Sequence, residues 1–391
     1  MNQIDVDRVR ADTPGCASVI HLGNAGAALQ PQPVVDAVIG YLQEEALVGG
    51  YEQNGAAADD IAHVYDAGAR LVGCERDELA MTSGASEAWW RAFLSIPLEA
   101  GDRVLIGRTE YSSNALALLQ AVERGVSVEV VSDDPTGQID LGALAAMLDD
   151  RVKLVALTSV AMTNGLVNPT AEVGALVKDA GAYFLVDACQ VAGQLPIDVE
   201  AWRCDFLSFT GRKFVRGPRG TGLLYVRRQI MDELLAPTFI DGRSATWSSE
   251  TSYDLAPTAQ RFEFFERSFA AMVGFGVAMT YAADLGLDAI EDRISMLADH
   301  LRSGLDEVPG VRVLDTGVRR CGIVTFDVEG VGAVEVMERL SAAGINVNAP
   351  DITGSRYDLV ARGVDVVVRA GVHYYNTIEE LDRTVAEVAA L

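Results

Sequence analysis

A repeated alternation of short apolar runs with helical patterns constrains the fold of this 391-residue chain more than any other feature. Each run is rich in β-branched or aromatic residues and ends on polar groups, which is typical of a buried parallel strand. Amphipathic helical patterns such as 140–148 and 171–179 lie between the runs. The predicted strands are 79–82, 104–107, 126–131, 154–158, 183–186, 206–209 and 222–226. We therefore expect an α/β fold with a mainly parallel seven-stranded sheet that helices cover on both faces.

The pattern changes after about residue 260. Two long helical patterns, 264–284 and 288–308, are followed by shorter strands and helices, which predicts a smaller C-terminal α+β domain. With 49% hydrophobic residues, the chain can bury a core large enough for two domains. We expect a large domain over residues 20–259 and a small domain built from residues 1–19 and 260–391.

Two neighbouring strands are followed by a carboxylate and a lysine. Asp187 comes directly after the run 183–186, and Lys213 comes shortly after the run 206–209. Ligands of such sheets bind beyond the carboxyl ends of the strands, so both side chains are expected at one edge. A lysine can form a Schiff base and a carboxylate can keep a pyridine nitrogen protonated, which is the minimum equipment for using pyridoxal 5'-phosphate (PLP). Taken alone, such a pair is more often an exposed ion pair.

Two further segments are suited to bind a phosphate group. Thr210 and Arg212 flank Lys213, and the glycine-rich stretch 217–222 follows, so a hydroxyl, a guanidinium and close backbone converge near one anion. Upstream, the segment 82–87 (Thr-Ser-Gly-Ala-Ser-Glu) turns through glycine into a helix start, where free N–H groups and the helix dipole attract anions. That segment is also an ordinary capping sequence. Together the two segments favour a phosphate-bearing cofactor.

The order of these motifs resembles the class V aminotransferase family of fold type I PLP enzymes. The likeness begins at Val6-Asp-Arg-Val-Arg-Ala and Ile20-His-Leu-Gly-Asn, continues through the segment 82–87, Glu110-Tyr111, Asp187-Ala-Cys-Gln and Thr210-Gly-Arg-Lys, and ends in the stretch 367–382, which opens with Val367-Val-Arg. Cysteine desulfurases, isopenicillin epimerase-like proteins and carbon–sulfur lyases belong to this family. The resemblance therefore implies a PLP-dependent lyase or transferase.

The resemblance implies a role for each matching residue. Lys213 would carry the cofactor and move the substrate α-proton, Asp187 would pair with the pyridine nitrogen, and Tyr111 would stack on the ring. Arg369 would grip the substrate carboxylate, for which a planar guanidinium is well suited. The other implied cofactor contacts are Ala85, Ser86, Thr163 (or its neighbour Asn164), Gln190, Thr210 and Arg212.

One implied contact comes from a second subunit. Ser248 lies in the stretch 241–259, which has no clear period and is expected to be an interdomain or intersubunit loop. Ser248 resembles a residue that reaches the phosphate in the neighbouring subunit. The resemblance thus implies a homodimer with shared active sites.

The segment 350–365 bears on the reaction. The corresponding loop of cysteine desulfurases carries the cysteine that forms a persulfide, and this segment contains none. Tyr111 also stands where many relatives stack a histidine. These departures predict a C–S lyase that eliminates from an S-substituted cysteine or its sulfoxide and gives pyruvate and ammonia. The first alternatives are an aminotransferase or an amino-acid epimerase of the same family. A cysteine desulfurase or a non-catalytic PLP-binding protein is a less favoured prediction.

The amino-acid composition limits which partners the protein can bind and where in the cell it is expected. A net charge of −25 would repel a phosphate backbone, so no nucleic-acid partner is expected. The family resemblance implies a small-molecule amino acid as the substrate. The apolar runs are short and the chain lacks a basic start followed by an apolar core, so no membrane contact is expected and a cytoplasmic location is the default. Five scattered cysteines and four histidines form neither a disulfide framework nor a metal motif, so no metal is expected.

Overall fold

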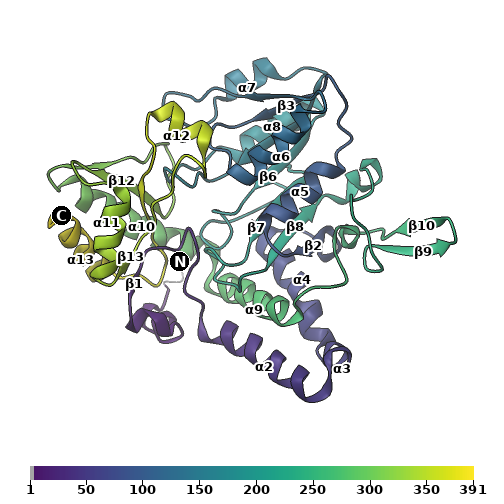
Figure 1. Ribbon diagram of the computed structural model, residues 1–391, viewed down its shortest axis with the longest axis horizontal. Helices are drawn as coiled ribbons and strands as arrows, with labels where there is room; N and C mark the ends of the chain where they lie inside the picture. The colour runs from purple at the N-terminus through teal and green to yellow at the C-terminus, as the bar shows by residue number, and fades with distance from the viewer. Residues whose placement is uncertain (1–3) are drawn as a thin grey trace.

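A seven-stranded sheet forms the centre of the larger group of elements in the computed structural model, which describes residues 4–391 (Figure 1). Its strand order is β2-β8-β7-β6-β5-β3-β4, and only β8 runs antiparallel to its neighbours. The strands are β2 (Leu79–Thr82), β3 (Arg103–Ile106), β4 (Ser127–Val130), β5 (Val152–Thr158), β6 (Tyr183–Asp187), β7 (Phe206–Thr210) and β8 (Gly222–Val226). All seven predicted strands are present, and the predicted fold class is confirmed.

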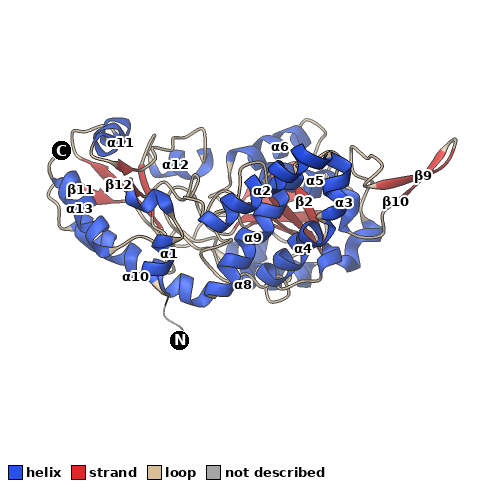
Figure 2. Ribbon diagram, turned by 90° about the horizontal axis from the view of Figure 1, so that it is seen from below, coloured by secondary structure: helices blue, strands red, loops and turns tan. Residues whose placement is uncertain are grey.

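Helices cover both faces of this sheet, as Figure 2 shows. Successive strand residues pack on opposite faces: Val104 and Ile106 join one apolar core, and Leu105 joins the other. Consistent with this, β3, β7 and β8 are buried along their whole length and are mainly apolar. The helices of this group are α2 (Gln32–Val48), α3 (Gly50–Ala56), α4 (Ala58–Val72), α5 (Ala85–Ser95), α6 (Ser112–Val122), α7 (Leu141–Met147), α8 (Thr170–Ala180) and α9 (Phe269–Leu285). Of these, α2 packs on α9 and α3 packs on α2 and α4.

A second, smaller group of elements surrounds a three-stranded antiparallel sheet of order β11-β12-β14. It has its own apolar core and is the expected α+β unit. A separate parallel pair joins β1 to β13. The elements are α1 (Val6–Ala11), β1 (Ile20–His21), α10 (Leu287–Asp306), β11 (Val311–Val313), β12 (Ile323–Val328), α11 (Ala333–Ala342), β13 (Ile345–Asn346), α12 (Arg356–Arg362), β14 (Val368–Gly371) and α13 (Ile378–Ala389).

Two contacts cross the predicted domain division. Helix α9 follows residue 260 yet packs against α2 and α4, beside the seven-stranded sheet. Strand β1 starts at Ile20 yet pairs with β13 of the smaller group. The division into 20–259 and the remainder stays a prediction.

The stretch 241–259 is not the aperiodic loop that was expected. It contains an antiparallel hairpin of β9 (Ala245–Ser249) and β10 (Ser252–Leu255), which projects away from the rest of the chain (Figure 2). Nearly all of its side chains are exposed, and Trp247 is 80% exposed. A strand with no buried face leaves no alternation of apolar and polar residues, and so the sequence pattern does not reveal it.

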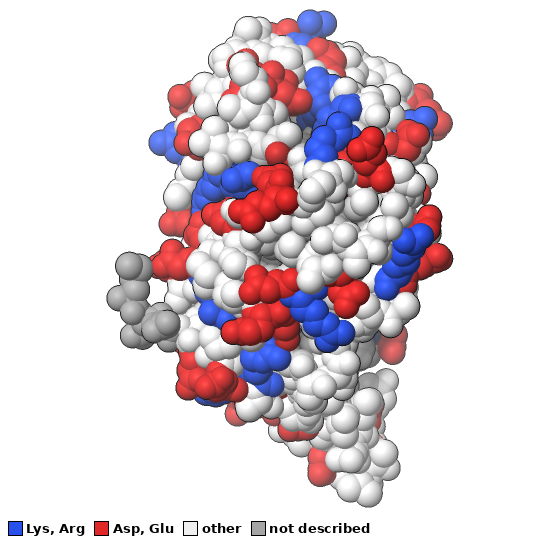
Figure 3. All heavy atoms as spheres, turned by 90° about the vertical axis from the view of Figure 1, so that its left-hand side faces the viewer, with Lys and Arg blue, Asp and Glu red and all other residues white. Residues whose placement is uncertain are grey.

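Charged side chains of both signs lie intermixed on the face of the molecule shown in Figure 3. Several form exposed ion pairs, such as Arg312 with Asp327 at 2.5 Å. Within residues 4–391, no single helix is long and apolar enough to cross a membrane, although α9 and α10 together pass that test as a pair bent by 79°. The same residues bring together no group of three His, Cys, Asp or Glu side chains that could hold a metal ion.

Candidate functional site

A cavity of about 390 Å³ lies beyond the carboxyl ends of β6 and β7. Asp187 is the last residue of β6, and Lys213 follows β7 by three positions. The parallel strands deliver both side chains to the same edge, as the sequence predicted. The predicted site residues that line this cavity are Ala85, Ser86, Tyr111, Asp187, Thr210, Arg212 and Lys213.

Lys213 is suited to act as a nucleophile. It is buried, and this burial lowers the pKa of its amine, although Cys189 and Asp187 act in the opposite direction. A lowered pKa leaves more of the amine in the neutral form that attacks a carbonyl. The Lys213 Nζ lies 5.8 Å from the centroid of the Tyr111 ring. The chain has two other lysines, Lys153 and Lys178, and both are exposed.

Asp187 is held in a fixed orientation. It is 4% exposed, its Oδ1 accepts from the Cys189 backbone N–H at 2.8 Å, and its Oδ2 accepts from Asn114 Nδ2 at 3.0 Å. Each carboxylate oxygen has a further lone pair for an N–H donor in the cavity. This arrangement suits a carboxylate that pairs with a protonated ring nitrogen.

The segment 82–87, which we predict to bind the phosphate and call the anion seat, forms the turn into α5 and the N-terminus of that helix. Gly84 precedes this 11-residue helix, and its first turn has no side-chain cap, so backbone N–H groups stay free beside the cavity. Gly222 of β8 packs tightly behind this turn, because a Cβ there would lie 2.5 Å from the Gly84 carbonyl carbon. Ser86 hydrogen-bonds Ser113 at 2.9 Å, and Thr210 donates to the Thr221 carbonyl at 3.2 Å. Both hydroxyls therefore have fixed positions.

Arg369 is a buried cation without an acidic partner in the described chain. It lies on β14, is 6% exposed, and donates to the Met162 carbonyl at 3.2 Å and to Asn348 Oδ1 at 3.4 Å. Its Nε is buried and, within residues 4–391, has no hydrogen-bond partner. Burial lowers the pKa of Arg369 to about 10, and the nearby Arg212 charge acts in the same direction. Such a group needs an anion, and a bidentate carboxylate supplies one.

Gln190 and Thr163 do not line the cavity. Gln190 donates to the Ala25 carbonyl at 3.1 Å, and its buried Oε1 has no partner among the described residues. Thr163 donates to Asp358 of α12 at 2.7 Å, and the alternative residue Asn164 accepts from the Leu166 backbone N–H at 3.1 Å. The cofactor contacts expected of Gln190 and of Thr163 or Asn164 stay predictions.

Ser248 lies on the projecting β9–β10 hairpin, outside the cavity of its own chain. Its hydroxyl is exposed and hydrogen-bonds Ser252 at 3.1 Å. A role in its own site is therefore ruled out by position, and the expected contact with a neighbouring subunit stays a prediction.

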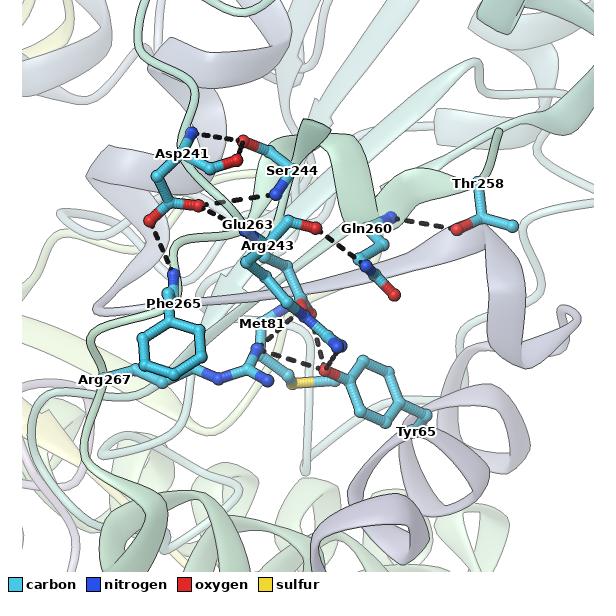
Figure 4. Close-up of polar contacts among 10 residues, drawn as sticks. All are labelled: Tyr65, Met81, Asp241, Arg243, Ser244, Thr258, Gln260, Glu263, Phe265 and Arg267. Carbon is cyan, nitrogen blue, oxygen red and sulfur yellow. Dashed lines mark hydrogen bonds and ion pairs between the residues drawn. The ribbon is translucent and has the colours of Figure 1, made fainter. Parts of the chain in front are cut away.

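A buried carboxylate fixes the base of this hairpin to the sheet, as Figure 4 shows. Glu263 is fully buried, and its Oε1 accepts from Tyr65 at 2.7 Å and from the Met81 backbone N–H at 2.8 Å. Its Oε2 accepts from Arg243 at 2.8 Å and from Arg267 at 2.6 Å. Because Met81 belongs to β2, this cluster joins the hairpin base to the strand that leads into the anion seat.

We expect Glu263→Gln to destabilise the protein by about 3 kcal/mol, because it removes the buried charge with which two half-buried guanidinium groups, those of Arg243 and Arg267, are paired. Urea unfolding measures this loss as a lower midpoint with an unchanged slope. Glu266→Gln, at an exposed position three residues away, is the control and should change stability by less than about 0.5 kcal/mol. Equal midpoints for Glu263→Gln and the natural protein would contradict this account.

Sequence reasoning missed two residues behind Asp187. Asn114 contacts Asp187 directly, and Glu110 accepts from the same Asn114 amide at 2.7 Å. The signal that could have found them is their spacing of four residues across the start of α6: Glu110 lies two residues before the helix and Asn114 lies in its first turn, where its amide reaches back to Glu110.

A family model decides the classification. The Aminotransferase class-V model matches residues 20–384. This chain belongs to that family. It is therefore a PLP-dependent enzyme, as the motif order predicted. The site fits the cofactor: Lys213 and Asp187 face one cavity, and the uncapped start of α5 lies beside them for the phosphate.

The relatives of this class V enzyme are similar over nearly their whole length. A probable cysteine desulfurase of Methanothermobacter thermautotrophicus is 30% identical and covers 98% of both chains. A cysteine desulfurase of Haloferax volcanii is 29% identical over 99% of this chain and 97% of its own. The solved structure of a cysteine desulfurase from Thermococcus onnurineus has a TM-score of 0.92 at 27% identity and covers 100% of this chain and 99% of its own.

The prediction of a C–S lyase, with cysteine desulfurase expected less, is wrong. It rested on the missing cysteine of residues 350–365, whereas the three relatives described above are cysteine desulfurases that match nearly the whole chain. The absence of one residue was given more weight than the similarity of the rest of the chain. The segment is also more ordered than a loop, because it contains α12, which Asp358 ties to Thr163.

Proposed function

We propose that this enzyme removes the sulfur of L-cysteine and transfers it to a thiol. In the balanced reaction, the acceptor sulfur forms an S–S bond with the substrate sulfur while the Cβ–S bond breaks. The proton of the acceptor thiol balances the new C–H bond, so L-cysteine and a thiol give L-alanine and a persulfide. The desulfurase relatives of similar length support this substrate.

The main observation in favour of an amino-acid substrate is that the Arg369 guanidinium is buried and that its Nε has no hydrogen-bond partner among the described residues. A buried, uncompensated cation is costly, and a substrate carboxylate offsets that cost. Arg369 also lies within electrostatic reach of Lys213, because its charge lowers the pKa of that amine. A substrate held there presents its amino group toward Lys213.

The protein groups divide the chemistry as follows. PLP, when bound, delocalises the electron pair that remains at Cα after proton removal. Lys213 would hold the cofactor and would move the Cα proton. Asp187 would keep the ring nitrogen protonated, Tyr111 would contact the ring, and Ala85, Ser86, Thr210 and Arg212 would hold the phosphate. Gln190 and Thr163 remain the proposed second contacts with the cofactor.

The acceptor thiol comes from another molecule. Residues 350–365 contain no cysteine, and the cysteine that lines the cavity is Cys189. Burial raises the pKa of Cys189 to about 12, and the adjacent Asp187 charge acts in the same direction. Its thiol therefore stays protonated at neutral pH and is a poor nucleophile.

The same proposal includes a cytoplasmic homodimer. The exposed hairpin with Trp247 and Ser248 supports a contact with the neighbouring subunit's phosphate site. All five cysteines are free, which supports a reducing compartment.

The test is to incubate the PLP-loaded enzyme with L-cysteine and dithiothreitol and to assay alanine, sulfide and pyruvate. We expect alanine and sulfide in equal amounts, at a rate that depends on dithiothreitol. Pyruvate and ammonia without alanine would overturn the proposal, and so would a rate that is independent of the added thiol.

Arg369→Ala is expected to raise the KM for cysteine about 100-fold, because it removes about 3 kcal/mol of charge-assisted hydrogen bonding. The visible absorption of bound PLP should stay unchanged. Arg356→Ala, at an exposed position on α12, is the control and should leave the KM as it is. Loss of PLP absorption in Arg369→Ala would contradict a role in substrate binding.

A further inference from the structure

Glu110 is a buried carboxylic acid that lies behind the cofactor pocket and has no assigned role. It is 1% exposed and follows β3. Its Oε1 accepts three hydrogen bonds, from Asn114 Nδ2 at 2.7 Å, Thr158 Oγ1 at 2.9 Å and the Tyr111 backbone N–H at 3.1 Å. Its Oε2 is buried and has no partner within residues 4–391. Because Oε1 is already saturated, a proton on this group resides on Oε2.

Asn114 joins this acid to Asp187. Its Nδ2 donates to Glu110 Oε1 at 2.7 Å and to Asp187 Oδ2 at 3.0 Å, so each of its two amide hydrogens serves one carboxyl group. The reversed amide would point its oxygen at a carboxylate oxygen, and the two neighbours therefore fix the orientation. The two carboxyl groups are thus coupled through a single rigid bridge.

The surroundings of Glu110 disfavour a negative charge on Glu110 while Asp187 is also negatively charged. Burial raises the pKa of Glu110 to about 7, and the charge of Asp187 raises it too, although the bonds from Asn114, Thr158 and Tyr111 oppose this. Asp187 on β6 and the adjacent Tyr111 are the ionisable groups beside Glu110. The other elements that contact it offer neutral groups: Asn114 on α6, Thr158 on β5, and Ser355 before α12, whose hydroxyl lies 3.5 Å from the Glu110 carbonyl.

Asp187 has ionisable neighbours on two sides: Lys213 and Cys189 lie on the cavity side, and Glu110 lies behind it, away from the cavity. Lys213 and Cys189 line the cavity with Asp187 and interact with it electrostatically. Glu110 does not line the cavity, so its proton does not exchange with the substrate. A change of its charge reaches the cofactor through Asn114 and Asp187.

We infer that Glu110 is a positioning residue that acts through Asn114 and Asp187 on the ring nitrogen of bound PLP. When Glu110 loses its proton, a second negative charge stands behind Asp187, and the ring nitrogen holds its proton more strongly. When Glu110 is neutral, that support is weaker. This inference deepens the proposed function, because it rests on the pairing of Asp187 with the ring nitrogen.

The test follows the nitrogen directly. The enzyme is loaded with ring-¹⁵N PLP, and the nitrogen chemical shift is recorded across neutral pH without substrate. We expect a step in the natural enzyme at the pH where Glu110 ionises, and no such step in Glu110→Gln. A variant that titrates identically to the natural enzyme would overturn the inference.

Thr158→Val provides a second, milder test. It removes one hydrogen bond to the ionised Glu110 and leaves Asp187 intact, so the midpoint of the step should move to higher pH by about one unit. Ser159→Ala is the matched control, because that hydroxyl bonds Thr170 at 2.7 Å and not Glu110, and its midpoint should not move. An unmoved midpoint in Thr158→Val would contradict the inference even if Glu110→Gln failed to fold.

Asp187→Asn separates the two proposals. If it leaves the nitrogen shift unchanged, the pairing of Asp187 with the ring is wrong and the inference falls with it. If it alters the shift while Glu110→Gln and Thr158→Val behave as the natural enzyme, the pairing stands and the role of Glu110 is refuted.

Discussion

Lys213→Ala is expected to lower the rate of alanine formation by at least about 1000-fold, because it removes the group that we propose both to hold PLP and to move the Cα proton. The visible absorption of bound PLP should also be lost or shifted. The fold should persist, since the lysine faces a cavity and makes no salt bridge among residues 4–391. Product assays, absorption spectra and an unfolding curve measure the three effects.

Lys153→Ala is the matched control for this experiment. Lys153 lies on β5 of the same sheet, is exposed, and donates to the Asp150 carbonyl at 2.8 Å. Its replacement should leave rate and spectrum unchanged. A Lys213→Ala protein that keeps both its spectrum and its rate would refute the assignment, because no other lysine reaches the cavity.

Asp187→Asn should reduce the rate about 100- to 1000-fold, because a neutral amide no longer stabilises the positive charge on the ring nitrogen. The shape of the side chain is nearly preserved. PLP should still bind, since Lys213 and the anion seat at α5 are intact. The measurement is kcat for alanine formation, together with the absorption spectrum of the loaded enzyme.

Asp205→Asn is the control for Asp187→Asn. Asp205 is also buried, but it precedes β7 and so lies at the opposite edge of the sheet, where it accepts from the Phe184 backbone N–H at 2.9 Å. We expect Asp205→Asn to cost stability and leave kcat unchanged. Equal losses of kcat in the two variants would show that a buried charge, and not its place beside the cofactor, explains the effect.

The sequence predicted much of the sheet and its chemistry for a physical reason. A strand buried on both faces is mainly apolar, as β3, β7 and β8 are, and such short runs could be located from composition and length. The parallel arrangement then placed the residues after β6 and β7 at one edge, which brought Asp187 and Lys213 together. The family and the cofactor follow from that pair and its order along the chain.

The reaction was predicted wrongly because a single local absence was given more weight than the whole chain. The missing cysteine in residues 350–365 indicated the wrong chemistry, although the remaining chain is similar to cysteine desulfurases. The absence of one cysteine leaves unchanged the residues that we propose to bind the substrate carboxylate and to transfer its proton. In the proposed reaction it alters only which thiol accepts the sulfur.

The amino-acid sequence by itself determined the strands, the helix start that seats an anion, and the residues that can do PLP chemistry, because these depend on local periodicity and on residue type. Only the tertiary structure decided which groups meet across long separations. The Asn114 bridge between Glu110 and Asp187 and the Glu263 cluster join segments 73 to 198 residues apart. No local pattern encodes such contacts, since they arise where packed elements bring distant side chains within hydrogen-bonding distance. The exposed hairpin that carries Ser248 escaped prediction because none of its faces is buried.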